Sequence, residues 1–180
     1  MKKNIIAVLL ASVCGFSVTA ANAADGTITF NGQITDTTCD VALSSPGATG
    51  GKDMVVELGA FLKSKIVSAN DVVSERDIAF NLTNCPAAIT KVGVKMEGTA
   101  DADMTDAFAN SLTVDASTGV AVKLMDGADV IKPNTDTAMK DITSGAADLQ
   151  YKAQFVATKA VADVTAGKYS SVVNYTMNYQ

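Results

Sequence analysis

The chain has 180 residues, which is enough for one domain with a buried core. Hydrophobic residues make up 48% of it, which excludes a disordered chain, and the formal net charge of −5 at pH 7 leaves no basic patch for nucleic acid or anionic lipid. The sequence contains no His, so Ser-His-Asp catalysis, Cys-His catalysis and the commonest zinc ligand are all excluded.

Residues 1–23 have the pattern of a secretory signal peptide. Two lysines near the start precede a mostly apolar run over residues 5–18, and Ala21 and Ala23 supply the A-x-A pattern of a cleavage site. A membrane anchor is the alternative interpretation, but the apolar run is short for a span and is interrupted by small and polar residues. The sequence therefore predicts an exported protein whose mature chain begins at Ala24.

The number of cysteines falls from three to two on export, because Cys14 is removed with the signal peptide. Cys39 and Cys85 remain, and in an oxidising compartment we expect a disulfide between them. On the chain-entropy account this bond closes a loop of about 47 residues and stabilises the fold by roughly 4 kcal/mol. Two free, buried cysteines are the alternative.

The mature chain alternates apolar and polar residues in many short segments, which is typical of strands. Residues 26–34 are expected to form one extended strand, although Asn31-Gly32 also fits a two-residue hairpin turn. Loops rich in Gly, Ser, Pro or acidic residues are expected at 44–52 and 98–110, and a turn at 126–127. Further strands are expected over residues 39–43, 54–58, 78–82, 92–96, 112–114, 120–124, 130–131 and 151–157.

The last fourteen residues alternate without a break and predict one long strand from Gly167 to the end of the chain. One of its faces is polar and the other is largely apolar. The second face carries Gly167, Tyr169, Ser171, Val173, Tyr175, Met177 and Tyr179. A strand of this length needs backbone partners along both edges, or it lies at an open edge of its sheet.

The pattern of elements indicates the fold class. No segment longer than ten residues keeps apolar residues at helical spacing, and the chain shows no internal repeat, linker or second domain. Many short strands separated by turns, together with one disulfide, predict an all-β sandwich of immunoglobulin type.

Two stretches suggest ligand chemistry but lack residues that the chemistry requires. Residues 46–53 are rich in glycine, yet proline and aspartate stand where a phosphate-binding loop has its first Gly and its Ser or Thr. The acidic loop at 98–110 lacks the Gly and the Glu of a calcium loop. We therefore expect no enzyme activity, no cofactor and no metal site.

Three features together resemble the pilin subunits of chaperone–usher fimbriae of the type 1-like kind. Near its start the mature chain has Gly26-Thr-Ile28-Thr-Phe30-Asn-Gly32 and reaches Cys39 soon afterwards, and Asn84-Cys85 closes an alternating strand. At the other end a glycine, Gly167, stands fourteenth from the terminus and a tyrosine, Tyr179, is penultimate. The resemblance extends over the whole mature chain.

The resemblance implies an incomplete immunoglobulin-like sandwich that lacks its final strand. A donor strand from a chaperone or from a neighbouring subunit completes such a fold. The implied division is a signal peptide at 1–23, a donor-strand extension at 24–35 and a pilin domain at 36–180. The implied donor residues are Ala24, Gly26, Ile28 and Phe30, with Gly26 at a shallow position of the groove. The implied acceptor groove and chaperone contact consist of Gly167, Tyr169, Val173, Tyr175, Met177 and Tyr179.

The resemblance also implies partners and a location. The expected partners are a periplasmic pilus chaperone, an outer-membrane usher, further pilin subunits in a head-to-tail homopolymer, and a host-surface receptor. The protein would then be a structural subunit of an adhesive fimbria, exported through the periplasm to the cell surface. The alternatives are an exported single-domain sandwich that binds a ligand without polymerising, and a small outer-membrane β-barrel.

Overall fold

The computed structural model describes residues 37–46, 48–49 and 51–180. The signal peptide predicted at 1–23, the extension predicted at 24–35 and the strand predicted at 26–34 lie outside the described residues. Within the described part of the chain, no helix is long and apolar enough to cross a membrane.

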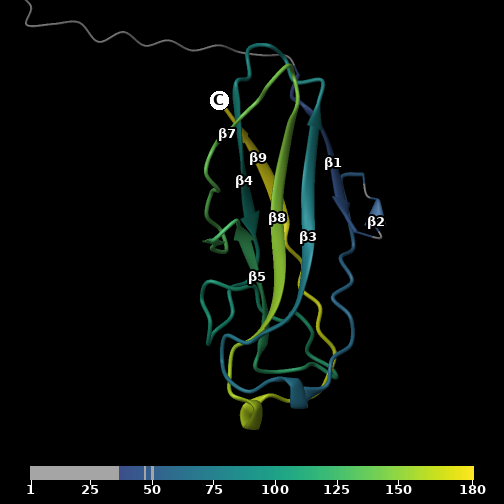
Figure 1. Ribbon diagram of the computed structural model, residues 1–180, viewed down its shortest axis with the longest axis vertical. Coiled ribbons are helices and arrows are strands. Elements are labelled where there is room, and N and C mark those ends of the chain that lie inside the picture. Colours follow the sequence, from purple (N-terminus) through teal and green to yellow (C-terminus); the bar gives the residue numbers. More distant parts are fainter. Residues whose placement is uncertain (1–36, 47, 50) are drawn as a thin grey trace, which may run out of the picture. The chain divides into compact units, whose positions relative to one another are not determined.

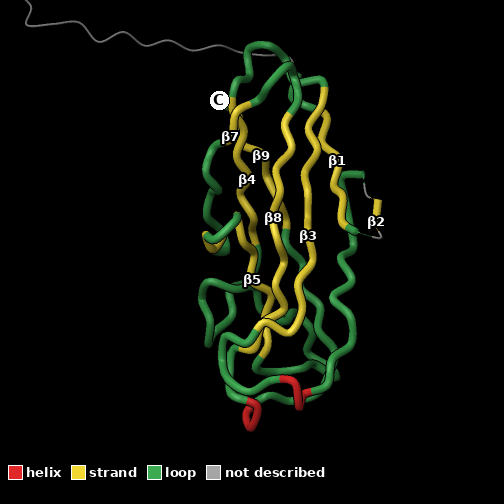
Figure 2. The backbone as a smooth tube through the Cα atoms, viewed as in Figure 1, coloured by secondary structure: helices red, strands yellow, loops and turns green. Residues whose placement is uncertain are grey.

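The described chain folds into two antiparallel sheets, as predicted for an all-β protein (Figures 1 and 2). The large sheet has the order β2-β1-β3-β8-β5-β6, and the small sheet has the order β7-β4-β9. The elements are β1 (Asp40–Ser45), β2 (Ala48–Thr49), η1 (Lys63–Lys65), β3 (Val72–Thr83), β4 (Lys91–Glu97), β5 (Val120–Asp126), β6 (Asp129–Ile131), β7 (Lys140–Asp141), β8 (Ala147–Ala157), η2 (Val161–Asp163) and β9 (Asn174–Tyr179).

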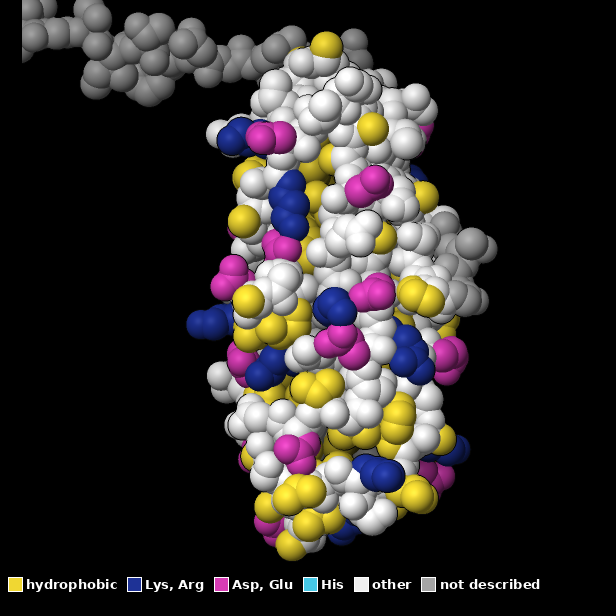
Figure 3. Space-filling model, in the orientation of Figure 1, with side chains coloured by type: hydrophobic (Ala, Val, Ile, Leu, Met, Phe, Trp, Pro, Cys, Tyr) yellow, Lys and Arg dark blue, Asp and Glu magenta, His cyan; other side chains and the backbone are white. Residues whose placement is uncertain are grey.

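The centre of the large sheet is the long pair β3 and β8, which are in register from Ile78 opposite Tyr151 to Leu82 opposite Ala147. Alternation along both strands sends one set of side chains inward. The outward set is polar, and Lys152 lies beside the carboxylates of Glu75 and Asp77, so basic and acidic side chains adjoin one another over this face (Figure 3). Exposed ion pairs of this kind add little stability and keep the face soluble.

The core forms where the inward faces of the two sheets meet. Phe80, Leu82 and Leu149 of the large sheet belong to the same buried cluster as Val92 and Val94 of β4, and each of the five is at most 3% exposed. The alternation predicted over 92–96 is therefore confirmed. Burying side chains of this size stabilises a fold by about 1.5–3 kcal/mol each.

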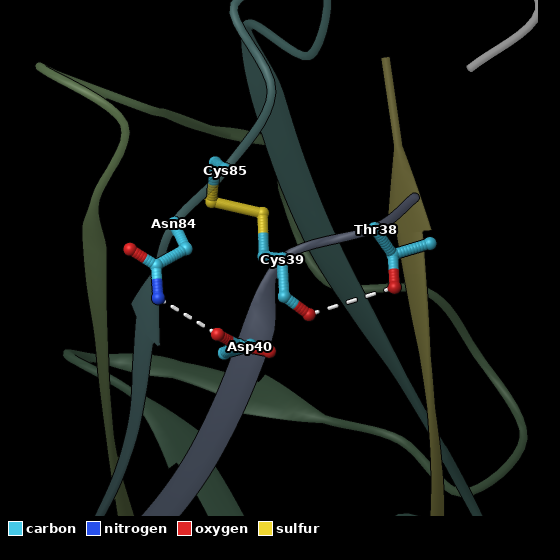
Figure 4. Close-up of a disulfide and its surroundings, with 5 residues drawn as sticks. All are labelled: Thr38, Cys39, Asp40, Asn84 and Cys85. Carbon is cyan, nitrogen blue, oxygen red and sulfur yellow. Dashed lines mark hydrogen bonds between the residues drawn. A yellow bond between two sulfur atoms is a disulfide. The ribbon is translucent and has the colours of Figure 1, made fainter. Parts of the chain in front are cut away.

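The predicted disulfide joins Cys39, immediately before β1, to Cys85, two residues after β3. Next to it, the Asn84 amide Nδ2 donates to Asp40 Oδ2 at 2.8 Å (Figure 4). Asn84 has φ 52°, a left-handed conformation that asparagine tolerates better than most residues. The bond and the amide together fix the start of β1 against the end of β3.

Two predicted strands are absent, and the terminal one is shorter than expected. Residues 54–58 and 112–114 are not strands, and β9 begins at Asn174 rather than at Gly167. The inward and outward alternation survives in 54–58 and in 169–175, but a ladder also needs a backbone neighbour at strand spacing. That neighbour depends on tertiary structure, which a period-2 pattern does not report.

Residues 167–173 run instead beside the loop before β5. Ser117 N donates to the carbonyl of Lys168 at 2.8 Å, and Ser170 N donates to Asn110 Oδ1 at 3.1 Å. At Gly167 the two backbones approach so closely that a Cβ would lie 2.5 Å from the carbonyl carbon of Ala116. Glycine is required there because the backbones approach closely. A turn is not the reason, since the φ of Gly167 is not in the left-handed region.

Candidate functional site

The strand β9 has a partner on one side only. Its ladder to β4 runs from Val92 opposite Tyr179 to Glu97 opposite Asn174. On the other side Tyr175 faces Lys52, and the residues just before β9 face the rest of the segment 52–58; among the described residues no backbone hydrogen bond joins that segment to residues 169–179. Among the strands of the described chain, none pairs with this edge of β9.

The segment 52–58 forms the opposite side of this opening and belongs to no ladder between described residues. Its alternation places Met54, Val56 and Leu58 partly inside, while Val55 is 73% exposed. Carbonyl groups of Glu57 and Leu58 accept hydrogen bonds from side chains of β3, but none of the backbone hydrogen bonds found in the described chain starts from an N–H of this segment. Backbone groups without partners on two facing segments are a template for an added strand.

A groove lies between the two segments. Its larger hollow has a volume of about 830 Å³, with residues 52–58 as one wall and 169–175 as the other. A second hollow of about 570 Å³ continues past Cys39 and Val41 to Tyr179. The floor of the larger hollow is apolar and consists of Leu43, Ile78, Phe80, Val122, Leu124 and Ala153.

Tyr175 spans the groove at the point where the two hollows meet. Its hydroxyl donates to the carbonyl oxygen of Lys52 on the opposite wall at 2.8 Å, and both residues line both hollows. Its ring packs edge-on against Phe80, with the centroids 5.0 Å apart. Burial, followed by the nearby negative charge of Asp53, raises the pKa of Tyr175 above its ordinary value.

Tyr169 stands on the same wall, five residues before β9 begins. Its hydroxyl donates to the carbonyl oxygen of Phe108 at 2.7 Å, and its ring packs edge-on against Phe155 at 5.0 Å. Burial raises the pKa of Tyr169 to about 12, so the phenol is neutral at every physiological pH. Both tyrosines are therefore held in place by a ring contact and a hydrogen bond.

The structure places most of the residues predicted for an acceptor groove along the opening. Tyr169 and Val173 line the larger hollow, Tyr179 lines the smaller one, and Tyr175 lines both. Met177 lies on the same face of β9 and packs against the buried core, outside both hollows. Gly167 also lies outside them, against the backbone of the loop before β5.

Sequence reasoning missed the opposite wall and the floor of the groove. The alternation at 54–58 was the available signal, but it indicated a paired strand rather than an unpaired edge. The four donor residues predicted at 24–30 lie outside the described residues. The described part of the chain contains no cluster of acidic, Cys or His side chains that could hold a metal ion.

A sandwich with an apolar groove between two unpaired backbone edges has the features of a fold that can accept an added strand. Comparison with known proteins gives the family of the chain. A family model described as "Fimbrial protein" matches residues 28–180. The chain is 36% identical over 170 residues to the major fimbrial subunit SMF-1 of Stenotrophomonas maltophilia (strain K279a), covering 89% of this chain and 95% of that one. It is 32% identical over 187 residues to the laminin-binding fimbrial subunit ElfA of Escherichia coli O157:H7, covering 99% of each.

Solved structures show the same fold. The P pilus rod subunit PapA matches with a TM-score of 0.65 and 19% identity, over 80% of this chain and all of that one. A subunit from the structure of a chaperone–usher pilus matches with a TM-score of 0.63 and 22% identity, over 87% and 96% of the two chains. The chain belongs to the fimbrial protein family. It is a non-enzymatic structural subunit of a cell-surface fimbria, as predicted.

Proposed function

We propose that this subunit polymerises head to tail by strand addition, with residues 24–35 of one copy filling the groove of the next. The observation that carries the proposal is the pair of unpaired backbone edges, 52–58 and β9, on either side of an apolar floor. An extended segment inserted between them would form ladder hydrogen bonds to both edges and join the two sheets into one closed sandwich.

The side chains of the extension suit this floor. Every second residue of an extended segment lies on the same face. When the extension is extended, one face therefore carries Ala24, Gly26, Ile28 and Phe30, and all four would point into the neighbouring groove. Burying Ile28 and Phe30 would contribute about 1.5–3 kcal/mol each, and each backbone hydrogen bond adds about 0.5–1.5 kcal/mol. A contact in which each copy gives one strand and receives one propagates and does not close, so repetition produces a fibre.

The empty groove also implies protection before assembly. An apolar hollow flanked by unpaired strand edges is an aggregation hazard. We infer that a periplasmic chaperone fills it with a strand of its own, and that the exchange for the extension of the next copy takes place at an outer-membrane usher. The relatives named as major fimbrial subunits favour the repeating subunit of the shaft as the role of this chain.

Two versions of the mature chain test the proposal. One is residues 24–180 unchanged. The other lacks residues 24–31 and carries a copy of residues 24–35 after Gln180, joined by a short turn so that the added strand runs antiparallel to β9. We expect the unchanged chain to form polymers or aggregates, and the second version to be a monomer that unfolds at a much higher temperature.

The matched control has the same appended strand with Ile28→Asp and Phe30→Asp in the copy. The control should lose the gain in stability, because two carboxylates would enter an apolar floor without partners. If the unchanged chain is a stable monomer and the appended strand changes neither size nor unfolding temperature, the groove is not a strand acceptor and the proposal is wrong.

A further inference from the structure

Apolar side chains are exposed at the end of the sandwich where η1 and η2 lie (Figures 2 and 3). Four large apolar residues of this end have exposed side chains, namely Phe61, Leu62, Val67 and Val72. The turn that carries them is held in place, because Ile66 is buried in one cluster with Val164, and Val67 N donates to Asp71 Oδ2 at 2.7 Å. Exposed apolar side chains gathered on a fixed turn indicate a surface for a partner.

Two lysines lie beside these apolar side chains and are without acidic partners. Lys63 and Lys65 belong to η1, and neither forms an ion pair within the described chain. The carboxylate of Asp71 is engaged by N–H groups of its own loop, and Asp163 lies separately on η2. The surface formed by Leu62, Lys63, Lys65 and Val67 is called the η1 patch below.

The opposite end of the sandwich carries acids without basic partners. Asp40 and Asp148 both lie beside the last residues of β3, are exposed, and form no ion pair with any described residue. The lysine of this end, Lys91, is paired with Asp141 at 3.7 Å. The loop that follows β3 adds a small exposed apolar side chain, Ala87. The surface formed by Asp40, Ala87 and Asp148 is called the acidic end below.

The η1 patch and the acidic end are too far apart to meet within one copy. The strand β3 begins at Val72 beside the η1 patch and ends at Thr83 beside the acidic end, and it has 12 residues. At about 3.3 Å per residue, the two surfaces are separated by about 36 Å. Lysines and carboxylates around apolar side chains are complementary groups for a protein interface, so these surfaces can meet only between two copies.

We propose that the η1 patch of one copy docks on the acidic end of the next copy, as a second contact beside the inserted strand. This inference rests on the proposed strand addition. The strand β9 runs toward the acidic end, where Tyr179 lies opposite Val92, so a strand added antiparallel to it leaves the groove at the η1 end. The domain that follows the added strand begins at its own acidic end, where Cys39 is joined to Cys85. Ends of unlike charge therefore face one another.

Insertion in the opposite direction is disfavoured by the same charges. It would bring the acidic ends of two copies together, with the carboxylates of Asp40 and Asp148 facing their counterparts, and juxtaposed like charges oppose association. The sheets already formed favour the same direction, since every ladder between strands in the described chain is antiparallel. Antiparallel pairs are also slightly more stable per residue than parallel ones.

Cross-linking with a carbodiimide tests the contact in polymers of the mature chain, residues 24–180. The reagent condenses a lysine amine with a carboxylate that touches it, and the amide remains when the polymer is dissociated. We expect mass spectrometry to find Lys63 or Lys65 joined to Asp40 or Asp148. The amides should be about tenfold more abundant in the polymer than in the monomer with the appended strand, because the groups lie about 36 Å apart within one copy.

Reversing the charge of the η1 patch gives an independent measurement. The double variant Lys63→Glu with Lys65→Glu should slow the growth of polymers about tenfold, because it places like charges on the two surfaces. Adding Asp148→Lys to the double variant should restore part of the growth rate. Lys132→Glu changes an exposed lysine on the loop between β6 and β7 and is the control, which should grow as the wild type does. Each variant, made as the monomer with the appended strand, should unfold at the wild-type temperature.

The outcomes separate this inference from the strand addition. Polymers that form without an amide between the two ends, or that grow normally after the charge reversal, would overturn the end-to-end contact and leave the strand addition standing. Failure of the unchanged chain to polymerise would overturn the strand addition, and this inference with it.

Discussion

Replacing Tyr169 by phenylalanine tests how tightly the wall of the groove holds its tyrosine. The variant Tyr169→Phe keeps the ring contact with Phe155 and removes the hydroxyl that donates to the carbonyl of Phe108. At neutral pH the loss of this hydrogen bond should lower the free energy of unfolding by about 1 kcal/mol.

The alkaline range gives the sharper prediction, because burial raises the pKa of Tyr169 to about 12. The unfolded chain loses the phenolic proton near pH 10, and the folded chain keeps it until about pH 12. The contribution of this group to stability is therefore complete below pH 10 and is lost as pH rises from 10 to 12. The loss should reach about 1.4 kcal/mol at pH 11.

Urea unfolding of the monomer with the appended strand, at several pH values from 7 to 11.5, measures the effect. The wild type should lose stability above pH 10 more steeply than Tyr169→Phe, so the two curves should converge or cross, because the other titrating groups are common to both. Tyr179→Phe, near the exposed end of β9, is the matched control and should change the alkaline slope less. Parallel curves for wild type and Tyr169→Phe between pH 9 and 11.5 would refute the reasoning.

Three other predictions concern the disulfide, the extension and a close backbone contact. Replacing Cys39 and Cys85 by alanine should lower the free energy of unfolding by roughly 4 kcal/mol in urea, and a loss below about 1 kcal/mol would contradict the entropic account. Phe30→Ala should reduce the length of polymers seen by electron microscopy, and the same change in the appended copy should lower the unfolding temperature of the monomer, because Phe30 would act by filling a groove. Gly167→Ala should lower stability by about 1–3 kcal/mol, since its Cβ would lie 2.5 Å from the backbone of Ala116, and a neutral result by thermal unfolding would show that the loop yields freely.

Much of the fold could be predicted from short-range alternation. Val92, Val94 and Met96 are all buried, as their spacing required, because a strand that packs one face on a core must alternate. The pairing of Cys39 with Cys85 followed from counting in an oxidising compartment. Tyr169, Val173, Tyr175 and Tyr179 also lie on one side of their segment, as predicted. The direction of a side chain depends on the period of an extended chain and not on its partners.

Tertiary structure alone decided which extended segments acquire partners. Residues 54–58 have the same alternation as a paired strand, yet they have no ladder because the position between them and β9 is left open. Residues 167–173 were expected to belong to the terminal strand but lie against the loop before β5, where the contact at Ala116 admits only glycine. The sequence by itself determined which residues face inward, because side-chain direction repeats every two residues along any extended chain. It could not determine where the groove lies, because an unpaired edge is defined by a missing neighbour more than one hundred positions away along the chain, as Lys52 and Tyr175 are.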